Sequence, residues 1–336
     1  MNQLDNDAKW GILGTANIAR KMMVPGLRDS ESSKLSGIAS RDPAKAEEFA
    51  DEFGVPEIYE SYEDLLSDLE IKFVYIPLPN HLHHEWTIKA ARKGKHVLCE
   101  KPLGVNAEEV REMFEAADEQ DVKLMEGFMY RFHPQVLRVK ELIDQGRIGT
   151  PTFFRGSFSF PLVNQNREDD IRWQEKMGGG SLMDLGTYSV NTVRYLFGEE
   201  PERVVARSST HPDHSAEAET QAILEFPGNK SAILDSSFLL SDRATYEIAS
   251  ETGRIKASNT YGPGLYNRSN VEIKEGNSTV IETLEGVNEY AREVDELVNA
   301  AREDGTPAIT PEDSINNARV LDAIARSAKS GSWTEV

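Results

Sequence analysis

The sequence has almost no cysteine, few basic side chains for its acidity, and no long apolar run. Cys99 is the single cysteine among 336 residues, which excludes an intrachain disulfide framework and a cysteine-based metal site. With 37 basic and 57 acidic side chains, the net charge of -20 repels nucleic acid and anionic membrane surfaces. No stretch has the length and apolarity of a membrane span or a signal peptide. We therefore expect a soluble cytoplasmic protein that binds neither nucleic acid nor membrane.

The first part of the chain alternates short apolar runs with amphipathic segments. Strands are predicted at 9–13, 34–39, 73–77, 95–99 and 122–126, and helices at 17–28, 43–53, 83–93, 107–119 and 135–145. Nearly continuous apolar strands separated by helices are typical of a parallel sheet covered on both faces. We expect residues 1–127 to form a doubly wound α/β dinucleotide-binding domain, that is, a Rossmann fold.

From Pro151 onward the apolar residues alternate with a period of two. Antiparallel strands are predicted near 154–160, 216–226, 230–240, 244–250 and 271–274, and helices at 288–302 and from Thr310. We expect residues 128–336 to form an α+β substrate-binding and oligomerisation domain with a large, mostly antiparallel open sheet. Because such a sheet has to be covered, we also expect a homodimer or homotetramer formed through it.

The first predicted strand runs into a loop of small residues. Gly14, Ala16 and Ala19 occupy the three positions of a G-x-G-x-x-G motif, in which small side chains allow close approach of a pyrophosphate and of the helix. An ordinary strand-to-helix turn can have the same pattern. The expected cofactor contacts in this loop are Gly14, Thr15, Ala16, Asn17 and Ile18.

The residues after the second strand bear on the choice between NAD and NADP. NAD sites usually carry an acidic residue there, whereas this chain has Ser40 and Arg41. A hydroxyl and a guanidinium suit a 2′-phosphate, so NADP is favoured, and Lys45 could add a second cation. Asp42 argues in the opposite direction, and the alternative is that these cations are solvated surface charges.

The segment after the third strand lies where open α/β sheets bind ligands, and its expected cofactor contacts are Pro77, Leu78, Asn80 and His83. His81, His83 and His84 could suggest a metal site. No carboxylate ligands accompany them, so we predict no metal.

Two further motifs carry residue types suited to proton and hydride chemistry. Lys101 follows the fourth strand in Glu100-Lys101-Pro102, where its ammonium could bind a substrate oxygen and stabilise an alkoxide; the alternative is a surface lysine in a turn. After glycines 178–180, Asp184 and Tyr188 stand four residues apart and share one face of a predicted helix. A nearby ammonium would favour the phenolate, which makes Tyr188 a candidate base.

These motifs resemble the Gfo/Idh/MocA oxidoreductases over essentially the whole chain. Many members have histidine and aspartate where this chain has Tyr188 and Asn191. In this respect the chain resembles the branch that contains dimeric dihydrodiol dehydrogenases and NADP-dependent D-xylose 1-dehydrogenases. The resemblance implies that Lys101 and Tyr188 are catalytic, with Asp184 holding the substrate or orienting Lys101. Asp184 could equally be a carboxylate stabilised near a helix start.

The resemblance also implies cofactor contacts from Glu100 and Lys101. It implies weaker ones beside the nicotinamide from Tyr130 and Arg131, and weaker contacts to cofactor or substrate from Arg172 and Trp173. Phe158, Phe160 and Trp173 could stack on a sugar ring, although such aromatic residues more often pack in a core.

The function that follows is hydride transfer between NADP and a hydroxyl or carbonyl carbon of a sugar or related polyhydroxylated ring. Two alternatives remain: a trans-dihydrodiol dehydrogenase, and a catalytically silent regulatory protein that senses NADP or sugar. The presence of both Lys101 and Tyr188 argues against the silent protein.

Overall fold

The computed structural model describes residues 8–165, 170–262 and 264–336. The chain divides into two compact units, one of Met1–Met129 with Asn288–Ile315 and the other of Tyr130–Val287 with Asn316–Val336. The first division lies close to the boundary expected after residue 127. The expected 128–336 domain differs from the second unit, because residues 288–315 belong to the first.

The first unit contains a parallel sheet with the strand order β3-β2-β1-β4-β5-β6 among the described residues. The strands are β1 (Ala8–Leu13), β2 (Ser33–Ala39), β3 (Glu57–Tyr59), β4 (Phe73–Ile76), β5 (His96–Glu100) and β6 (Leu124–Gly127). The central strands are apolar and buried, as expected when helices cover both faces. This order confirms the doubly wound prediction and places the switch point, where such sheets bind ligands, between β1 and β4.

Some helices of the first unit begin or end at recognisable capping residues. They are η1 (Ala19–Met23), α1 (Val24–Asp29), α2 (Pro43–Phe53), α3 (Tyr62–Ser67), η2 (Asn80–Leu82), α4 (His83–Arg92), α5 (Ala107–Glu119) and α8 (Glu289–Arg302). Asn106 caps α5 by accepting the Glu109 N–H, and Gly54 ends α2 with a positive φ of 67°. A Cβ on Gly26 would lie 2.8 Å from the Tyr290 Cβ, so glycine is needed where α1 meets α8.

The second unit contains a larger sheet, with the described order β14-β13-β12-β11-β7-β10-β9-β8-β15. The strands are β7 (Phe153–Ser159), β8 (Arg203–Thr210), β9 (Glu217–Phe226), β10 (Lys230–Ser237), β11 (Arg243–Ala249), β12 (Gly253–Ser258), β13 (Ser269–Glu275), β14 (Ser278–Leu284) and β15 (Thr334–Glu335). Its neighbouring strands pair antiparallel except for β7 with β10, which are parallel. The mostly antiparallel prediction is confirmed.

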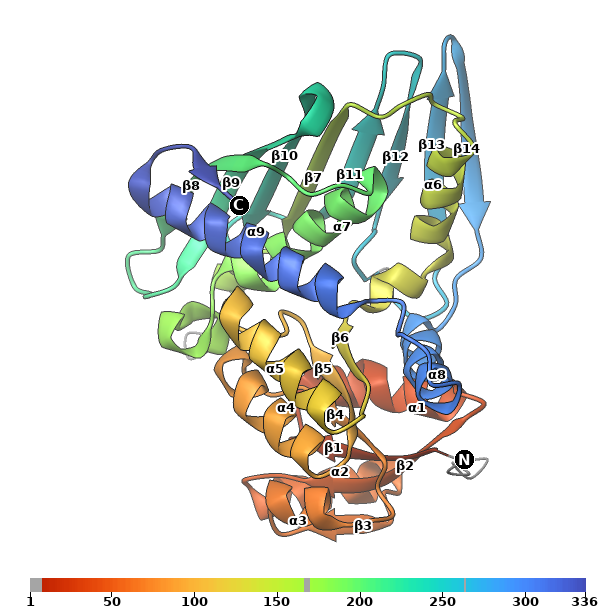
Figure 1. Cartoon of the computed structure of the whole chain (residues 1–336), viewed down its shortest axis with the longest axis vertical. Coiled ribbons are helices and arrows are strands. Elements are labelled where there is room, and N and C mark those ends of the chain that lie inside the picture. The colour runs from red at the N-terminus through yellow and green to blue at the C-terminus, as the bar shows by residue number, and fades with distance from the viewer. Residues whose placement is uncertain (1–7, 166–169, 263) are drawn as a thin grey trace. The chain divides into compact units, whose positions relative to one another are not determined.

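Helices lie along one face of this sheet, as α6, α7 and α9 in Figure 1 show. The helical segments are η3 (Met129–Phe132), α6 (Pro134–Asp144), η4 (Leu162–Asn164), η5 (Ile171–Trp173), η6 (Glu175–Met177), η7 (Leu182–Gly186), α7 (Thr187–Phe197), η8 (Pro227–Asn229) and α9 (Pro311–Ser330). A Cβ on Gly156 would lie 3.1 Å from the Ser189 Cβ, so α7 packs closely on β7. Ser327 of α9 accepts the Ala206 N–H of β8 at 2.9 Å.

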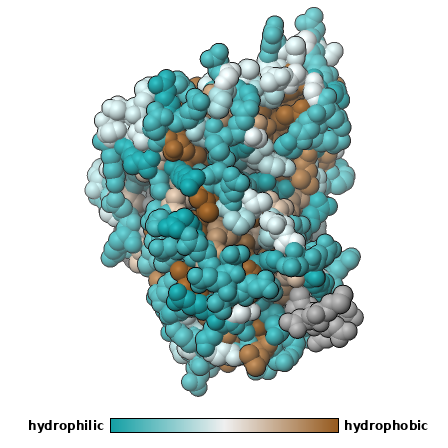
Figure 2. Space-filling model, in the orientation of Figure 1, coloured by the Kyte–Doolittle hydropathy of each residue, from teal (hydrophilic) through white to brown (hydrophobic). Residues whose placement is uncertain are grey.

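Most of the surface visible in Figure 2 is hydrophilic. None of the helices formed by the described residues combines the length and the apolarity needed to cross a membrane.

Candidate active site

The loop after β1 turns at a glycine. Gly14 has φ +96°, and a Cβ there would lie 3.1 Å from Leu78 Cδ2, so only glycine fits without strain. Thr15 and Ala16 are partly exposed and Asn17 is exposed, whereas Ala19 is buried where the helix packs. Residues 15–17 of the loop are therefore at least partly accessible, whereas Gly14 itself is buried.

Ser40 and Arg41 line a cavity of about 340 Å³ beside the carboxyl end of β2. The Tyr62 and Trp86 rings form an edge-to-face pair in its wall, with centroids 4.8 Å apart. Burial raises the pKa of the Tyr62 phenol, and the Arg41 guanidinium, which hydrogen-bonds it, opposes that rise. The full lining is Ser40, Arg41, Glu60, Ser61, Tyr62, Glu63, Leu82, Glu85 and Trp86. A hydroxyl, a cation and aromatic rings together suit a phosphorylated nucleoside.

Lys45 does not join this lining. It is exposed, and its Nζ lies 3.6 Å from the Asp42 carboxylate on the same helix. Lys45, which was expected to favour a 2′-phosphate, and Asp42, which argued against one, thus pair with each other at the surface.

His83 supports the site from behind rather than facing a ligand. It is fully buried, with Nδ1 2.9 Å from the Pro102 carbonyl oxygen and Nε2 2.7 Å from that of Leu78. Burial lowers the pKa of His83 to about 4, so the neutral ring donates to one carbonyl at a time. The expected direct cofactor contact is corrected: His83 links the turn after β4 to the turn after β5. Pro77 and Leu78 are buried beside it, and Asn80 is partly exposed.

Lys101 follows β5 directly, at the carboxyl edge of the sheet, and its side chain is partly exposed. The preceding Glu100 accepts the Tyr75 O–H at 2.6 Å. A Cβ on Gly127 would lie 3.3 Å from the Glu100 Cα, so the end of β6 packs closely here. These contacts fix the backbone that carries the Lys101 ammonium.

Buried carboxyl groups from α8 lie close to Glu100. Glu293 and Glu289 are 1% and 2% exposed, and neither Glu289 oxygen has a hydrogen-bond partner within the described part of the chain. Burial raises the pKa of Glu289 to about 8. Burial also raises the pKa of Glu293 well above its usual value, and the charges of Glu100 and Glu289 add to that rise. Both groups therefore favour their protonated forms.

We expect this pair to make the fold less stable in alkali. The folded protein holds a proton on Glu289 that the unfolded chain releases from about pH 4.5, so the free energy of unfolding falls as pH rises toward 8. Glu289→Gln should remove part of this loss, giving a variant about 3 kcal/mol more stable than wild type near pH 9 and similar to it near pH 5. Denaturant unfolding across this range measures the difference, with the exposed Glu303→Gln as control. A constant offset at every pH would contradict the assignment.

In the second unit, Tyr188 lies within a cluster of aromatic rings. It is 6% exposed, with its ring centroid 5.8 Å from Tyr130, 5.4 Å from Phe158 and 5.3 Å from Tyr261. Phe158 thus packs beside the candidate base, whereas Phe160 packs on Phe238. Sequence reasoning missed Tyr261, which comes from a loop with no periodic signal.

Asn191 connects this cluster to the segment after β6. Its Oδ1 accepts the Tyr130 O–H at 2.6 Å and an Arg131 N–H at 3.3 Å. The Arg131 guanidinium also lies over the Tyr195 ring, 3.6 Å from its centroid. Tyr130, Arg131 and Asn191 therefore form one hydrogen-bonded group beside Tyr188.

Asp184 lies in the π-helical turn η7 and is paired with Arg172. The Arg172 Nε donates to Asp184 Oδ2 at 2.6 Å, and its Nη1 reaches Asp170 Oδ1 at 3.3 Å. The charge of Asp184 raises the pKa of Arg172, with a further contribution from Asp170, so the guanidinium stays protonated. Such π turns often occur at functional sites. The predicted helix is confirmed, but its first turn is wider than an α-helix.

Trp173 is a core residue and not an exposed contact. It is 2% exposed, lies in a buried cluster with Leu185, Ala218 and Phe238, and stacks on the His214 ring at 4.1 Å. The expected cofactor contact from Trp173 is corrected on this ground. Searched across the described residues, the structure contains no group of three histidine, cysteine or acidic side chains able to hold a metal ion.

A parallel sheet with a glycine turn at its switch point defines a dinucleotide-binding protein of the doubly wound class. Residues 8–128 match the model of the "Oxidoreductase family, NAD-binding Rossmann fold", and residues 136–256 match the GFO/IDH/MocA C-terminal domain. The chain belongs to the GFO/IDH/MocA oxidoreductase family, which confirms the resemblance seen in its motifs.

Several known proteins are similar over most of the chain. D-xylose 1-dehydrogenase (NADP(+)) 2 of Haloferax volcanii is 37% identical, over 97% of this chain and 99% of that protein. Trans-1,2-dihydrobenzene-1,2-diol dehydrogenase of Xenopus laevis is 35% identical over 69% of each chain. A 3-ketoreductase of Actinomadura kijaniata, solved with NADP and TDP-benzene, has a TM-score of 0.90 and 31% identity, over 96% of this chain and 98% of that one. Variants of that reductase with a tyrosine or a lysine replaced have also been solved.

Proposed function

We propose that this protein is an NADP-dependent dehydrogenase for an aldose or a related polyhydroxylated ring. The observation that carries the proposal is the pairing of Ser40 and Arg41 in one cavity at the carboxyl end of β2. The names of two relatives, a xylose dehydrogenase that uses NADP and a ketoreductase solved with NADP, support both the cofactor and the sugar-like substrate. The first unit binds the cofactor, and the second supplies the substrate-binding side chains.

The proposed reaction removes a proton and a hydride from one CH–OH group. NADP held at Ser40 and Arg41 would supply the hydride acceptor. Tyr188 takes the hydroxyl proton as the phenolate, which the Lys101 ammonium favours, and the same ammonium hydrogen-bonds the substrate oxygen. Asp184, held by Arg172, accepts a hydrogen bond from a neighbouring substrate hydroxyl. The reverse sequence reduces a carbonyl group.

A substrate panel tests this proposal directly. Purified protein is incubated with aldoses, polyols and trans-dihydrodiols, each with NADP and with NAD, and reduced nicotinamide is followed by absorbance. We expect oxidation of an aldose with NADP. A response to dihydrodiols alone would favour the second candidate, which the aromatic rings of Tyr130, Phe158 and Tyr261 around Tyr188 also suit. Tight NADP binding without any turnover would favour a regulatory protein.

We also propose that the protein forms a homodimer or homotetramer through the sheet of the second unit. Ile223 and Ile233 pair across β9 and β10 and are 42% and 40% exposed, and Ile281 of β14 is 63% exposed. Uncovered apolar side chains on a sheet favour association. Ile223→Glu combined with Ile233→Glu is expected to yield monomers by light scattering. Val163→Glu, at an exposed site outside the sheet, is the control. An unchanged mass for the double variant would place the interface elsewhere.

A further inference from the structure

The helix that carries Asp184 and Tyr188 has an unusual beginning. The Ser181 side chain makes no capping bond to the backbone of this helix. Instead, the carboxylate of Glu217, at the start of β9, accepts the Leu182 N–H with Oε1 and the Ser181 O–H with Oε2 at 2.7 Å. Thr220 adds a third donor at 3.2 Å. A residue distant in sequence therefore provides the acceptor that the helix start needs.

The backbone on both sides is shaped around this carboxylate. Gly180 has φ +118°, a conformation that strains other residues, and a Cβ there would lie 2.6 Å from Glu217 Oε1 and displace the carboxylate. On β9 the register shifts, since Thr210 pairs with Glu217 while Ser209 pairs with Glu219. The extra residue is a β-bulge, which redirects the adjacent side chain.

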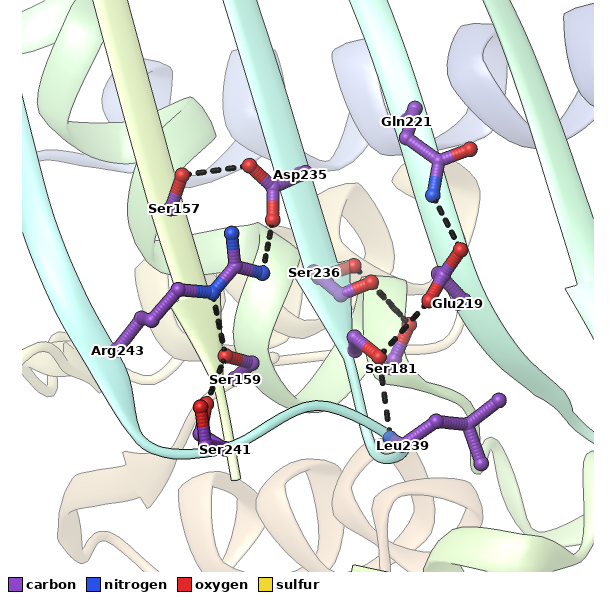
Figure 3. Close-up of polar contacts among 11 residues, drawn as sticks. Ser157, Ser159, Ser181, Glu219, Gln221, Asp235, Ser236, Leu239, Ser241 and Arg243 are labelled. Atoms are coloured by element: carbon purple, nitrogen blue, oxygen red, sulfur yellow. Dashed lines mark hydrogen bonds and ion pairs between the residues drawn. The ribbon is translucent and has the colours of Figure 1, made fainter. Parts of the chain in front are cut away.

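The same turn is also tied to β10. In Figure 3 the Ser181 and Ser236 side chains point toward each other. Their Oγ atoms lie 3.0 Å apart, and a Cβ on Gly186 would lie 3.3 Å from the Ser236 Oγ. Glu217 and Ser236 thus hold the π turn from two neighbouring strands. Any movement of the carboxylate would shift the turn that contains Asp184.

We propose that Glu217 is a positioning residue, whose carboxylate fixes the first turn of this helix and thereby the direction of Asp184 and Tyr188. The inference rests on the proposed roles of those two side chains. A carboxylate at a helix N-terminus is also favoured by the helix dipole. Burial raises the pKa of Glu217 to about 7, while the bonds from Leu182, Ser181 and Thr220 oppose that rise and favour the ionised form. This is the form that accepts all three donors.

The test compares Glu217→Ala, Glu217→Gln and Glu217→Asp with the control Glu219→Ala. Glu219, two residues along β9, accepts instead from Gln221 (Figure 3) and from Ser237. Each variant is assayed for kcat, for the KM of substrate and NADP, and for amide hydrogen exchange over residues 181–188. Glu217→Ala is expected to lower kcat about 30-fold, because a small misplacement of reacting groups is costly, and to leave the KM for NADP unchanged. Glu217→Gln keeps an acceptor for Leu182 and should remain within about threefold of wild type.

Glu217→Asp keeps the charge but is one methylene shorter, so it should lose kcat about tenfold while remaining folded. This variant keeps the test decisive if Glu217→Ala does not fold. Wild-type kcat and exchange in Glu217→Asp, or equal losses in the Glu217 and Glu219 variants, would overturn the positioning role. Faster exchange at 181–188 in the Glu217 variants, with no turnover in any protein including wild type, would support the contact while refuting the proposed function.

Discussion

Lys101→Met is expected to lower kcat about 1,000-fold, and Tyr188→Phe by a similar factor, while both variants bind NADP almost as tightly as wild type. Methionine resembles the lysine chain as far as Cε but lacks the charged Nζ that stabilises a developing alkoxide, a loss of about 100-fold to 1,000-fold in kcat. Phenylalanine keeps the ring within its aromatic cluster but cannot take a proton. Steady-state kinetics and NADP titration by fluorescence measure the two effects separately.

Matched controls distinguish loss of chemistry from loss of packing. Tyr261→Phe removes a phenol from the same aromatic cluster as Tyr188 and should leave kcat within about threefold, because this hydroxyl is not assigned to proton transfer. Lys93→Met removes an exposed ammonium of the first unit and should have no effect. Near wild-type turnover in Lys101→Met or Tyr188→Phe would remove the proposed acid-base pair.

Arg41→Ala should lower kcat/KM for NADP about 100-fold and change that for NAD by less than about threefold. A guanidinium bound to a phosphate makes charge-assisted bonds of roughly 1.5–3 kcal/mol, which only the 2′-phosphate of NADP can accept at this position. Initial rates with both cofactors, at a fixed concentration of the best substrate from the panel, give the ratio.

Lys45→Ala is the control for Arg41. Lys45 is paired with Asp42 and does not line the cavity, so its removal should alter NADP use by less than about threefold. Equal losses with NAD and NADP in Arg41→Ala would show that Arg41 supports the fold of the cavity, through its bond to Tyr62, and does not select the cofactor.

Much of the fold follows from local apolar patterns. The buried strands of the first unit were predictable because both of their faces are covered, which leaves an almost continuous apolar run. Short or exposed strands could not be predicted in this way. β3 has only three residues, and β14 is largely exposed, so its sequence shows no clear alternation of apolar and polar residues. The helix expected at 288–302 is confirmed as α8. Its sequence could not show that it packs on α1, because amphipathicity identifies the buried face of a helix and not its partner.

The candidate site was predictable where a motif is local and hidden where it depends on tertiary contacts. The spacing of Asp184 and Tyr188 placed both on one helix, but the π turn and the bond to Arg172 arise from packing. Trp173 and His83 were overestimated as ligand contacts, because sequence does not reveal that a residue beside a site is buried. Glu217 gave no signal at all, since Ser181 and Leu182, whose helix start it bonds, lie about 35 residues earlier in the chain.

The discontinuity of the first unit limits how this protein can be divided. The backbone passes from one unit to the other after Met129, Val287 and Ile315, so three peptide connections join them. A fragment that ends at Met129 would lack α8 and would expose the apolar surface that Tyr290 covers at Gly26. If the second unit were exchanged for that of a relative by fusion at one junction, the first unit would therefore lose its own segment 288–315. That segment has to be kept with the first unit.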